Sequence, residues 1–234
     1  MGIVAGVDGC KKGWFCITKN LYTWDINSAV YSDAKSLLRQ QPEPLIIAID
    51  IPIGLTEAGP RICDIEARKL LGPRRSSVFP APIRPALQSN TRQQADEIRR
   101  KIERKGVSAQ AFGIYKKVLE LDKILSTRPQ LQQQVKEVHP EVCFWAWNLK
   151  QSMPNTKKSQ GEQAQRRALI DKVFGRDSVN KIRTEYLRRI AATDDIYDAF
   201  AALWTAERIF KGKAEVIPNP SPQDAIGLRM EIWY

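Results

Sequence analysis

The sequence of 234 residues has little of what several classes of protein depend on. It contains one histidine, His139, and no serine or cysteine inside a recognisable nucleophile motif, which argues against a hydrolase with a Ser-His-Asp triad. Its four cysteines lack C-x-x-C spacing, so they indicate reduced structural thiols in a cytoplasmic protein. No window reaches the roughly 18 apolar residues of a membrane span, and the first apolar run, of about six residues, is too short for a secretory signal.

Positive charge is what the chain has in excess. It carries 37 Lys and Arg against 26 Asp and Glu, a formal net charge of +11. Residues 61–117 hold 14 basic against 5 acidic residues, and residues 157–189 hold 10 against 4. A polyanion is attracted to such a surface, so nucleic acid is the first partner expected, although solvated helix faces would give the same counts. A homo-oligomer is left open.

The order of apolar segments and turn residues predicts one α/β domain spanning residues 1–234. Segments 3–9, 13–18 and 21–26, with Lys19-Asn20 as a tight connection, predict a three-stranded antiparallel meander. Residues 45–49 are apolar on both faces, as in the central strand of a sheet covered by helices. We therefore expect a mixed sheet of three antiparallel strands plus parallel strands, flanked by helices, with a helical insertion at about 61–130. Further strands are expected at 135–140, 214–218 and 227–234, and further helices at 32–41, 160–174, 178–190 and from 193 onward.

Acidic residues stand where the predicted strands end. Asp8 closes the first strand, Asp50 closes the buried strand, and Glu137 lies near the end of the fifth. Ligand sites in α/β sheets lie outside the carboxyl ends of the parallel strands, so we expect these acids to gather there. Asp8 and Asp50 also have a simpler explanation, because aspartate beside glycine or proline favours a turn at a strand exit.

Three more aspartates begin the last long helix, in the segment "TDDIYDAFAALWTAE". If Thr193 is the N-cap, Asp194 and Asp195 lie in the first turn, where the helix dipole favours negative charge. Asp198 lies one turn further along and on the same face as Asp195. Small residues continue that face and would let the helix lie close to the sheet. A solvated acidic helix end is the alternative.

Together, Asp8, Asp50, Asp195 and Asp198 would form a cluster of four carboxylates. Such a cluster repels itself unless it takes up protons or binds cations, and one or two Mg²⁺ or Mn²⁺ ions would make it a metal site. Paired ions of this kind bind phosphate, activate water and stabilise the leaving oxygen in phosphodiester hydrolysis. The sequence therefore predicts a metal-dependent nuclease.

Glu137 and His139 are weaker catalytic candidates. Strand alternation in "EVHPEV" would place Glu137, His139 and Glu141 on one side, where the imidazole could orient water, move a proton or bind metal. A structural histidine that caps the helix beginning at Pro140 is the alternative. The neighbouring "FWAW" invites a base-stacking interpretation, but an apolar helix that packs on the sheet is favoured.

Phosphate-binding candidates lie in two segments. "GPRRSSVFPAP" places Arg74, Arg75, Ser76 and Ser77 after a Gly-Pro break, and guanidinium groups and hydroxyls suit phosphate. An ordinary exposed basic loop would have the same composition. Lys11 lies in "VDGCKKG", which resembles a phosphate loop but lacks the spacing of the known fingerprints.

A series of motifs resembles a known family. "GVDGCKKGW", "AIDIPIGL", "GPRRSSVFPAP", "GVSAQ", "EVHPEVCFWAW" and "TDDIYDAFAALWTA" occur in the order seen in the prokaryotic family called domain of unknown function 429. Its members are described as predicted nucleases with an RNase H-like fold. The resemblance implies an RNase H-like sheet with a helical insertion, and metal-dependent phosphodiester cleavage. It also implies that the metal-binding acids are Asp8, Asp50, Asp195 and Asp198.

The first motif differs from the family pattern at one position, and the motif of the last helix also resembles that of another group of proteins. Lys12 stands where members of the family often have glycine, which adds charge beside Asp8 and leaves the acid intact. The spacing Asp195-x-x-Asp198-Ala199 resembles the terminal-helix motif of Holliday-junction resolvases. Two other functions stay open, because a fold does not fix a function. These are a nucleotide-dependent phosphotransferase or ATPase of the related actin-like fold, and a non-catalytic nucleic-acid-binding protein.

Overall fold

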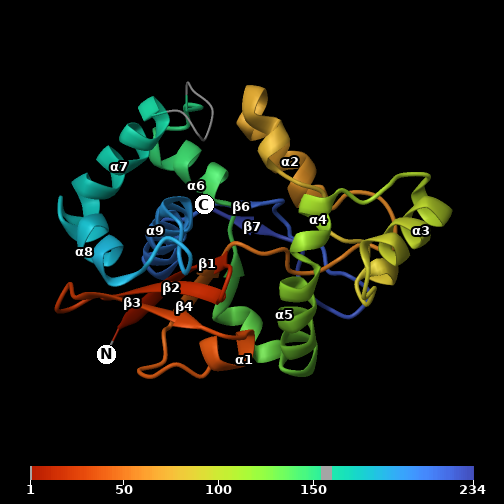
Figure 1. Ribbon diagram of the computed structural model, residues 1–234, viewed down its shortest axis with the longest axis horizontal. Helices are drawn as coiled ribbons and strands as arrows, with labels where there is room; N and C mark the ends of the chain where they lie inside the picture. Colours follow the sequence, from red (N-terminus) through yellow and green to blue (C-terminus); the bar gives the residue numbers. More distant parts are fainter. Residues whose placement is uncertain (1, 154–159) are drawn as a thin grey trace.

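A computed structural model describes residues 2–153 and 160–234 (Figure 1). Its main sheet has five strands in the order β3-β2-β1-β4-β5. β1, β2 and β3 are antiparallel neighbours, whereas β4 runs parallel to β1 and β5 runs parallel to β4. The predicted α/β fold with a mixed sheet is confirmed, and the arrangement is consistent with an RNase H-like fold. The strands are β1 (Ile3–Cys10), β2 (Gly13–Asn20), β3 (Ile26–Tyr31), β4 (Ile46–Ile49) and β5 (Val135–Glu137), and a second sheet pairs β6 (Val216–Ile217) with β7 (Ile232–Trp233).

Helices connect and cover these strands. The segment between β4 and β5 is helical, as the sequence predicts for about residues 61–130. It contains α2 (Ile62–Leu71), η1 (Gly72–Ser77), η2 (Arg84–Ala86), α3 (Arg92–Glu103), α4 (Ala109–Gly113), α5 (Tyr115–Thr127) and η3 (Pro129–Gln133). The other helices are α1 (Ala34–Leu37), α6 (Pro140–Trp147), α7 (Gln160–Phe174), α8 (Ser178–Glu185) and α9 (Thr193–Phe210).

Alternation along the strands gives the sheet two apolar faces. Val4 of β1 and Ala48 of β4 belong to a core that includes residues of α6, α7, α8 and α9. Val7 and Ile49, which lie one residue out of phase, belong to a second core with α1 and α5. Figure 1 shows α9 lying against one face of the sheet and α1 on the other side. A strand residue in phase with Val4 and Ala48 therefore points toward α9.

Helix α9 lies unusually close to the middle of β1. A Cβ atom added to Gly6 would stand 2.1 Å from the backbone N of Leu203 and 2.3 Å from the backbone O of Ala199. No side chain fits in that space, because both neighbours are backbone atoms. The glycine and the small residues of the helix together bring the start of α9 to the end of β1.

The third strand is not where the sequence predicts it. Residues 21–25 form the turn, because the Asn20 side chain accepts hydrogen bonds from the backbone N–H groups of Tyr22 and Thr23, at 2.9 and 3.3 Å. Trp24 adopts a left-handed conformation with φ 66° and donates its N–H to the Asn20 carbonyl. Pairing resumes only when Ile26 meets Lys19, so β3 begins at the end of the segment predicted as a strand.

Several helix boundaries differ from the prediction. Helix α1 is shorter than 32–41, because Asp33 caps it by accepting a hydrogen bond from Ser36 N at 2.8 Å. Helix α8 ends at Glu185 instead of 190. Thr193 is the first residue of α9 and Ala192 is its N-cap, so the predicted cap is wrong by one residue. Of the predicted second basic segment, residues 157–159 lie outside the described residues.

The remaining expectations for the core agree with the structure. Phe144, Trp145 and Trp147 are buried, and Trp147 stacks on Trp204 with ring centroids 5.0 Å apart. All four cysteines are buried and none forms a disulfide. Within residues 2–153 and 160–234, none of the helices combines the length and the apolar content needed to cross a membrane.

Candidate active site at the carboxyl ends of the parallel strands

A pocket with a volume of about 600 Å³ lies at the carboxyl end of β4. One wall consists of strand-end residues and the start of α6, and another wall is the η1 segment with the loop that follows it. The lining residues are Asp50, Ile51, Pro52, His139, Pro140, Glu141, Pro73, Arg74, Ser76, Ser77, Phe79, Ile114 and Met153.

Asp8 and Asp50 lie on the same face of the sheet at this edge. Val7 pairs with Ile49, and the Asp50 N–H donates to the Val7 carbonyl at 3.0 Å, so the two aspartates follow neighbouring paired positions. Asp8 is in phase with Val4, and Asp50 is in phase with Ala48, so both carboxylates are on the α9 side. Asp8 also accepts a hydrogen bond from the Gly9 N–H at 2.6 Å.

The two aspartates of α9 lie near this edge and have specific partners. Asp195 accepts a hydrogen bond from Ala192 N at 2.8 Å and thereby fixes the helix start. Asp198 is only 4% exposed and accepts a hydrogen bond from Arg166 at 3.1 Å.

Two buried thiols each lie near two of the four predicted aspartates. Burial raises the pKa of the Cys143 thiol to about 12, and the charges of Asp50 and Asp198 add to the increase. Burial also raises the pKa of Cys10, where the charges of Asp195 and Asp8 add to the increase. Asp50 and Asp198 therefore lie near Cys143, and Asp8 and Asp195 lie near Cys10.

A buried network of ion pairs adjoins the pocket. Arg166 of α7 is 1% exposed and pairs with Asp198, with Glu162 at 2.8 Å and with Glu141. Its guanidinium lies 4.5 Å from the centre of the Phe144 ring. Burial lowers the pKa of Arg166, but the charges of Asp198 and Glu141 outweigh this effect and raise it above its ordinary value. The network joins α6, α7 and α9.

Arg74 belongs to the same network. It pairs with Glu141 at 2.8 Å and with Glu162 at 2.6 Å, so two guanidinium groups and three carboxylates meet here. Sequence reasoning proposed Arg74 for phosphate but missed Arg166 and Glu162. The Glu162–Arg166 spacing of four residues is a local signal, but nothing local connects it to Asp198.

Glu137 does not line the pocket. It is in phase with Val135, which belongs to the core on the side of α1 and α5, so it lies on the opposite face of the sheet from Asp50. Arg61 donates to both of its carboxylate oxygens, at 2.6 and 2.7 Å, and the Ile53 N–H donates at 2.6 Å. This buried ion pair gives Glu137 a structural role.

His139 lines the pocket together with Asp50 and is the N-cap residue of α6. Its carbonyl accepts the Cys143 N–H at 2.9 Å as the first turn of that helix forms. The two interpretations of this histidine are therefore compatible, because the backbone starts the helix while the side chain faces the pocket.

The other predicted phosphate ligands differ in position. Ser76 and Ser77 line the pocket, and Ser77 donates its hydroxyl to the Arg74 carbonyl at 2.8 Å. Arg75 is exposed and is not a lining residue. Lys11 is exposed in the turn between β1 and β2.

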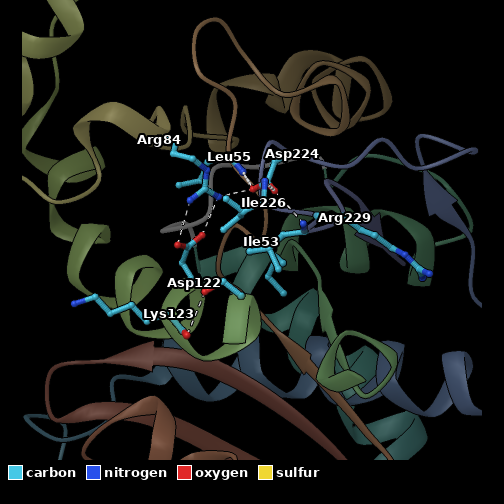
Figure 2. A network of polar contacts seen from close by, with 12 residues as sticks. Ile53, Leu55, Arg84, Asp122, Lys123, Asp224, Ile226 and Arg229 are labelled. Atoms are coloured by element: carbon cyan, nitrogen blue, oxygen red, sulfur yellow. Dashed lines mark hydrogen bonds and ion pairs between the residues drawn. The ribbon is translucent and has the colours of Figure 1, made fainter. Parts of the chain in front are cut away.

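A network on the insertion side holds the loop that follows Asp50 (Figure 2). Asp224 accepts the Leu55 N–H at 2.9 Å and pairs with Arg84, which also pairs with Asp122 of α5 at 3.0 Å. Figure 2 shows the Arg84 guanidinium between the two carboxylates. The strand exit is thereby tied to η2, to α5 and to the C-terminal segment.

The site can be tested for a divalent ion by its donor chemistry. Asp8 and Asp50 supply carboxylate oxygens, the ligand type that Mg²⁺ and Mn²⁺ prefer. In the part of the chain that the structure describes, no three His, Cys, Asp or Glu side chains are grouped so that they could hold a metal ion. Magnesium is commonly bound by one or two carboxylates together with water and substrate phosphate, and a pair of aspartates fits that mode.

Comparison with known proteins identifies the family. Neither the curated proteins nor the solved structures contain a match to the chain. The sequence model of the family described as protein of unknown function (DUF429) matches residues 6–223. Because this match spans β1 to the C-terminal segment and so covers most of the sequence, the chain belongs to the DUF429 family.

Proposed function

We propose that the protein is a metal-dependent nuclease that hydrolyses phosphodiester bonds of DNA or RNA. One observation carries the proposal: Asp8 and Asp50 directly follow the paired residues Val7 and Ile49 of the parallel strands β1 and β4, on one face of the sheet, and Asp50 lines a pocket of about 600 Å³. Paired carboxylates at this position in an α/β sheet suit a site that handles phosphate through divalent ions.

Asp8 and Asp50 would hold the ion, with Asp195 and Asp198 beside them. A bound Mg²⁺ or Mn²⁺ lowers the pKa of coordinated water and stabilises negative charge on phosphate. Arg166 fixes the position of Asp198, and the Ala192 N–H fixes that of Asp195. These two acids therefore need little reorganisation when a substrate binds.

Residues on the pocket walls would handle the substrate. Ser76 and Ser77 provide hydroxyl groups for phosphate oxygens, and the His139 imidazole provides a nitrogen that can accept or donate a proton. The basic residues of 61–117 would attract the nucleic-acid backbone toward the pocket.

Cleavage of labelled single-stranded, duplex and branched oligonucleotides with Mg²⁺ or Mn²⁺ tests the proposal. The wild type should cut at least one substrate, EDTA should stop the reaction, and Asp50→Asn should slow it by at least about 100-fold. Glu57→Gln, which changes an exposed carboxylate outside the pocket, should be as active as the wild type.

Two other results would replace the proposal. Saturable ATP binding without nuclease activity would favour a nucleotide-dependent phosphotransferase or ATPase. Salt-sensitive nucleic-acid binding that survives Asp50→Asn, with no cleavage of any substrate, would favour a non-catalytic binding protein.

A further inference from the structure

We propose that the pocket receives one unpaired nucleotide, with its base against Phe79, and that single-stranded nucleic acid is therefore the substrate class. The cleavage step of this idea rests on the proposed nuclease function, whereas the binding step stands on the lining of the pocket. The two can be tested separately.

The size and composition of the pocket suit a small, partly apolar ligand. Its volume of about 600 Å³ lies within the range of roughly 300–1,000 Å³ that is typical of small-molecule sites. Phe79, Ile114 and Met153 contribute apolar surface, while Asp50 and His139 contribute polar groups. A nucleotide combines the same two characters in its base and its sugar phosphate.

Phe79 is the feature that points to a base. It lines the pocket and is 49% exposed, so its ring is accessible from the pocket side. Within residues 2–153 and 160–234 it stacks on no other ring, whereas Trp147 stacks on Phe144 and on Trp204. An exposed ring on a pocket wall is the surface on which proteins stack unpaired bases.

The residues around Phe79 suit the rest of the nucleotide. Ser76 and Ser77, three and two residues earlier, place hydroxyl groups on the same wall, and Arg75 is exposed beside them. Asp50 lies on the strand-end wall, where the proposed hydrolysis takes place. If a base stacks on Phe79, the phosphate of the same nucleotide would lie near these polar groups.

The pocket selects against duplexes on simple geometric grounds. Bases in a double helix are stacked and paired, so a single base can enter the pocket only if it is flipped out or already unpaired. Opening a duplex costs free energy that a single strand does not require. The pocket should therefore bind single strands more tightly than duplexes of the same length.

Binding is best measured in EDTA, so that cleavage cannot interfere. Fluorescence anisotropy at 150 mM salt would compare a fluorescein-labelled ten-residue oligothymidine, its duplex with oligoadenosine, and an abasic strand of the same length. We expect the oligothymidine to bind at least about ten-fold more tightly than the abasic strand or the duplex, which is the effect of one stacked base.

Variants of Phe79 then test the stacking. Phe79→Ala should weaken oligothymidine binding about ten-fold and leave binding of the abasic strand unchanged, whereas Phe79→Tyr should stay within about two-fold of the wild type. Tyr22→Ala, a change to an exposed aromatic residue in the turn between β2 and β3, is the matched control and should have no effect. An unchanged thermal midpoint establishes that each variant is folded.

Two results would overturn the inference: equal binding of duplex and single strand by the wild type, or an oligothymidine affinity that Phe79→Ala does not change. Cleavage in Mn²⁺ is recorded separately. A protein with Phe79-dependent binding of single strands but no cleavage would retain the inference and refute the nuclease proposal. Cleavage by a protein whose binding of single strands does not depend on Phe79 would retain the nuclease proposal and refute the inference.

Discussion

Replacement of Arg166 by methionine should strongly destabilise the fold. The guanidinium is 1% exposed and pairs with Asp198 at 3.1 Å, with Glu162 at 2.8 Å and with Glu141. Arg74 also pairs with Glu141 and Glu162, so the variant keeps one guanidinium group beside these two carboxylates and loses the one that pairs with all three. Removing one partner from a buried ion pair costs about 3–5 kcal/mol, because a charge is left uncompensated in a medium of low polarity.

Urea denaturation followed by tryptophan fluorescence measures this loss. With a slope of roughly 2–3 kcal/mol/M, the midpoint should fall by about 1–2.5 M.

Arg167→Met is the matched control on the same helix. Arg167 pairs with Asp171 at 2.7 Å, but the two side chains are 24% and 23% exposed. Water screens such a pair, so its loss should cost at most about 1 kcal/mol. The reasoning is refuted if Arg166→Met is no more destabilising than Arg167→Met.

Three further predictions concern packing, thiols and the C-terminal segment. Gly6→Ala should lower the free energy of unfolding by about 3 kcal/mol or more, because its methyl group would meet backbone atoms of α9. Gly113→Ala is the control: no atom lies within 4 Å of the added Cβ, so this change should be neutral or stabilising. Thermal unfolding measures both variants. The Cys16 and Cys143 thiols should resist alkylation at pH 8 until the protein is unfolded in urea, since burial raises their pKa to about 12; rapid labelling of the native protein would contradict this. Asp224→Ala should cost about 2–4 kcal/mol by chemical denaturation, because the buried carboxylate joins the Leu55 N–H to Arg84, and a midpoint equal to that of the wild type would refute this role.

Much of the fold can be predicted from the sequence, because apolar runs and turn residues act locally. The buried strand at 45–49 and the apolar helix from Pro140 both lie where their patterns indicate. The third strand is misplaced because Asn20 organises a turn through its side chain, and strand propensity contains no information about that hydrogen bond.

The site is predictable only in part. Asp8 and Asp50 can be found because each follows an apolar run, and the parallel pairing of β1 with β4 then brings them together, although β1 continues past Asp8 to Cys10. The side to which Glu137 points is decided by the pairing of a three-residue strand with β4, so the local pattern cannot fix it. Arg166 lies 32 residues before Asp198 and 25 after Glu141, and only the packed structure makes them neighbours.

The close packing of α9 on β1 also bears on how the chain is made. β1 leaves the ribosome first, but the helix that covers one of its faces begins only at Thr193. At about 5–20 residues per second, that apolar face stays uncovered for roughly 10–40 seconds during synthesis. Nascent chains stalled before residue 193 should therefore be cut by protease within β1 and β2, and chains extended past α9 should be protected. A chaperone could then bind this apolar face only until α9 emerges and covers it.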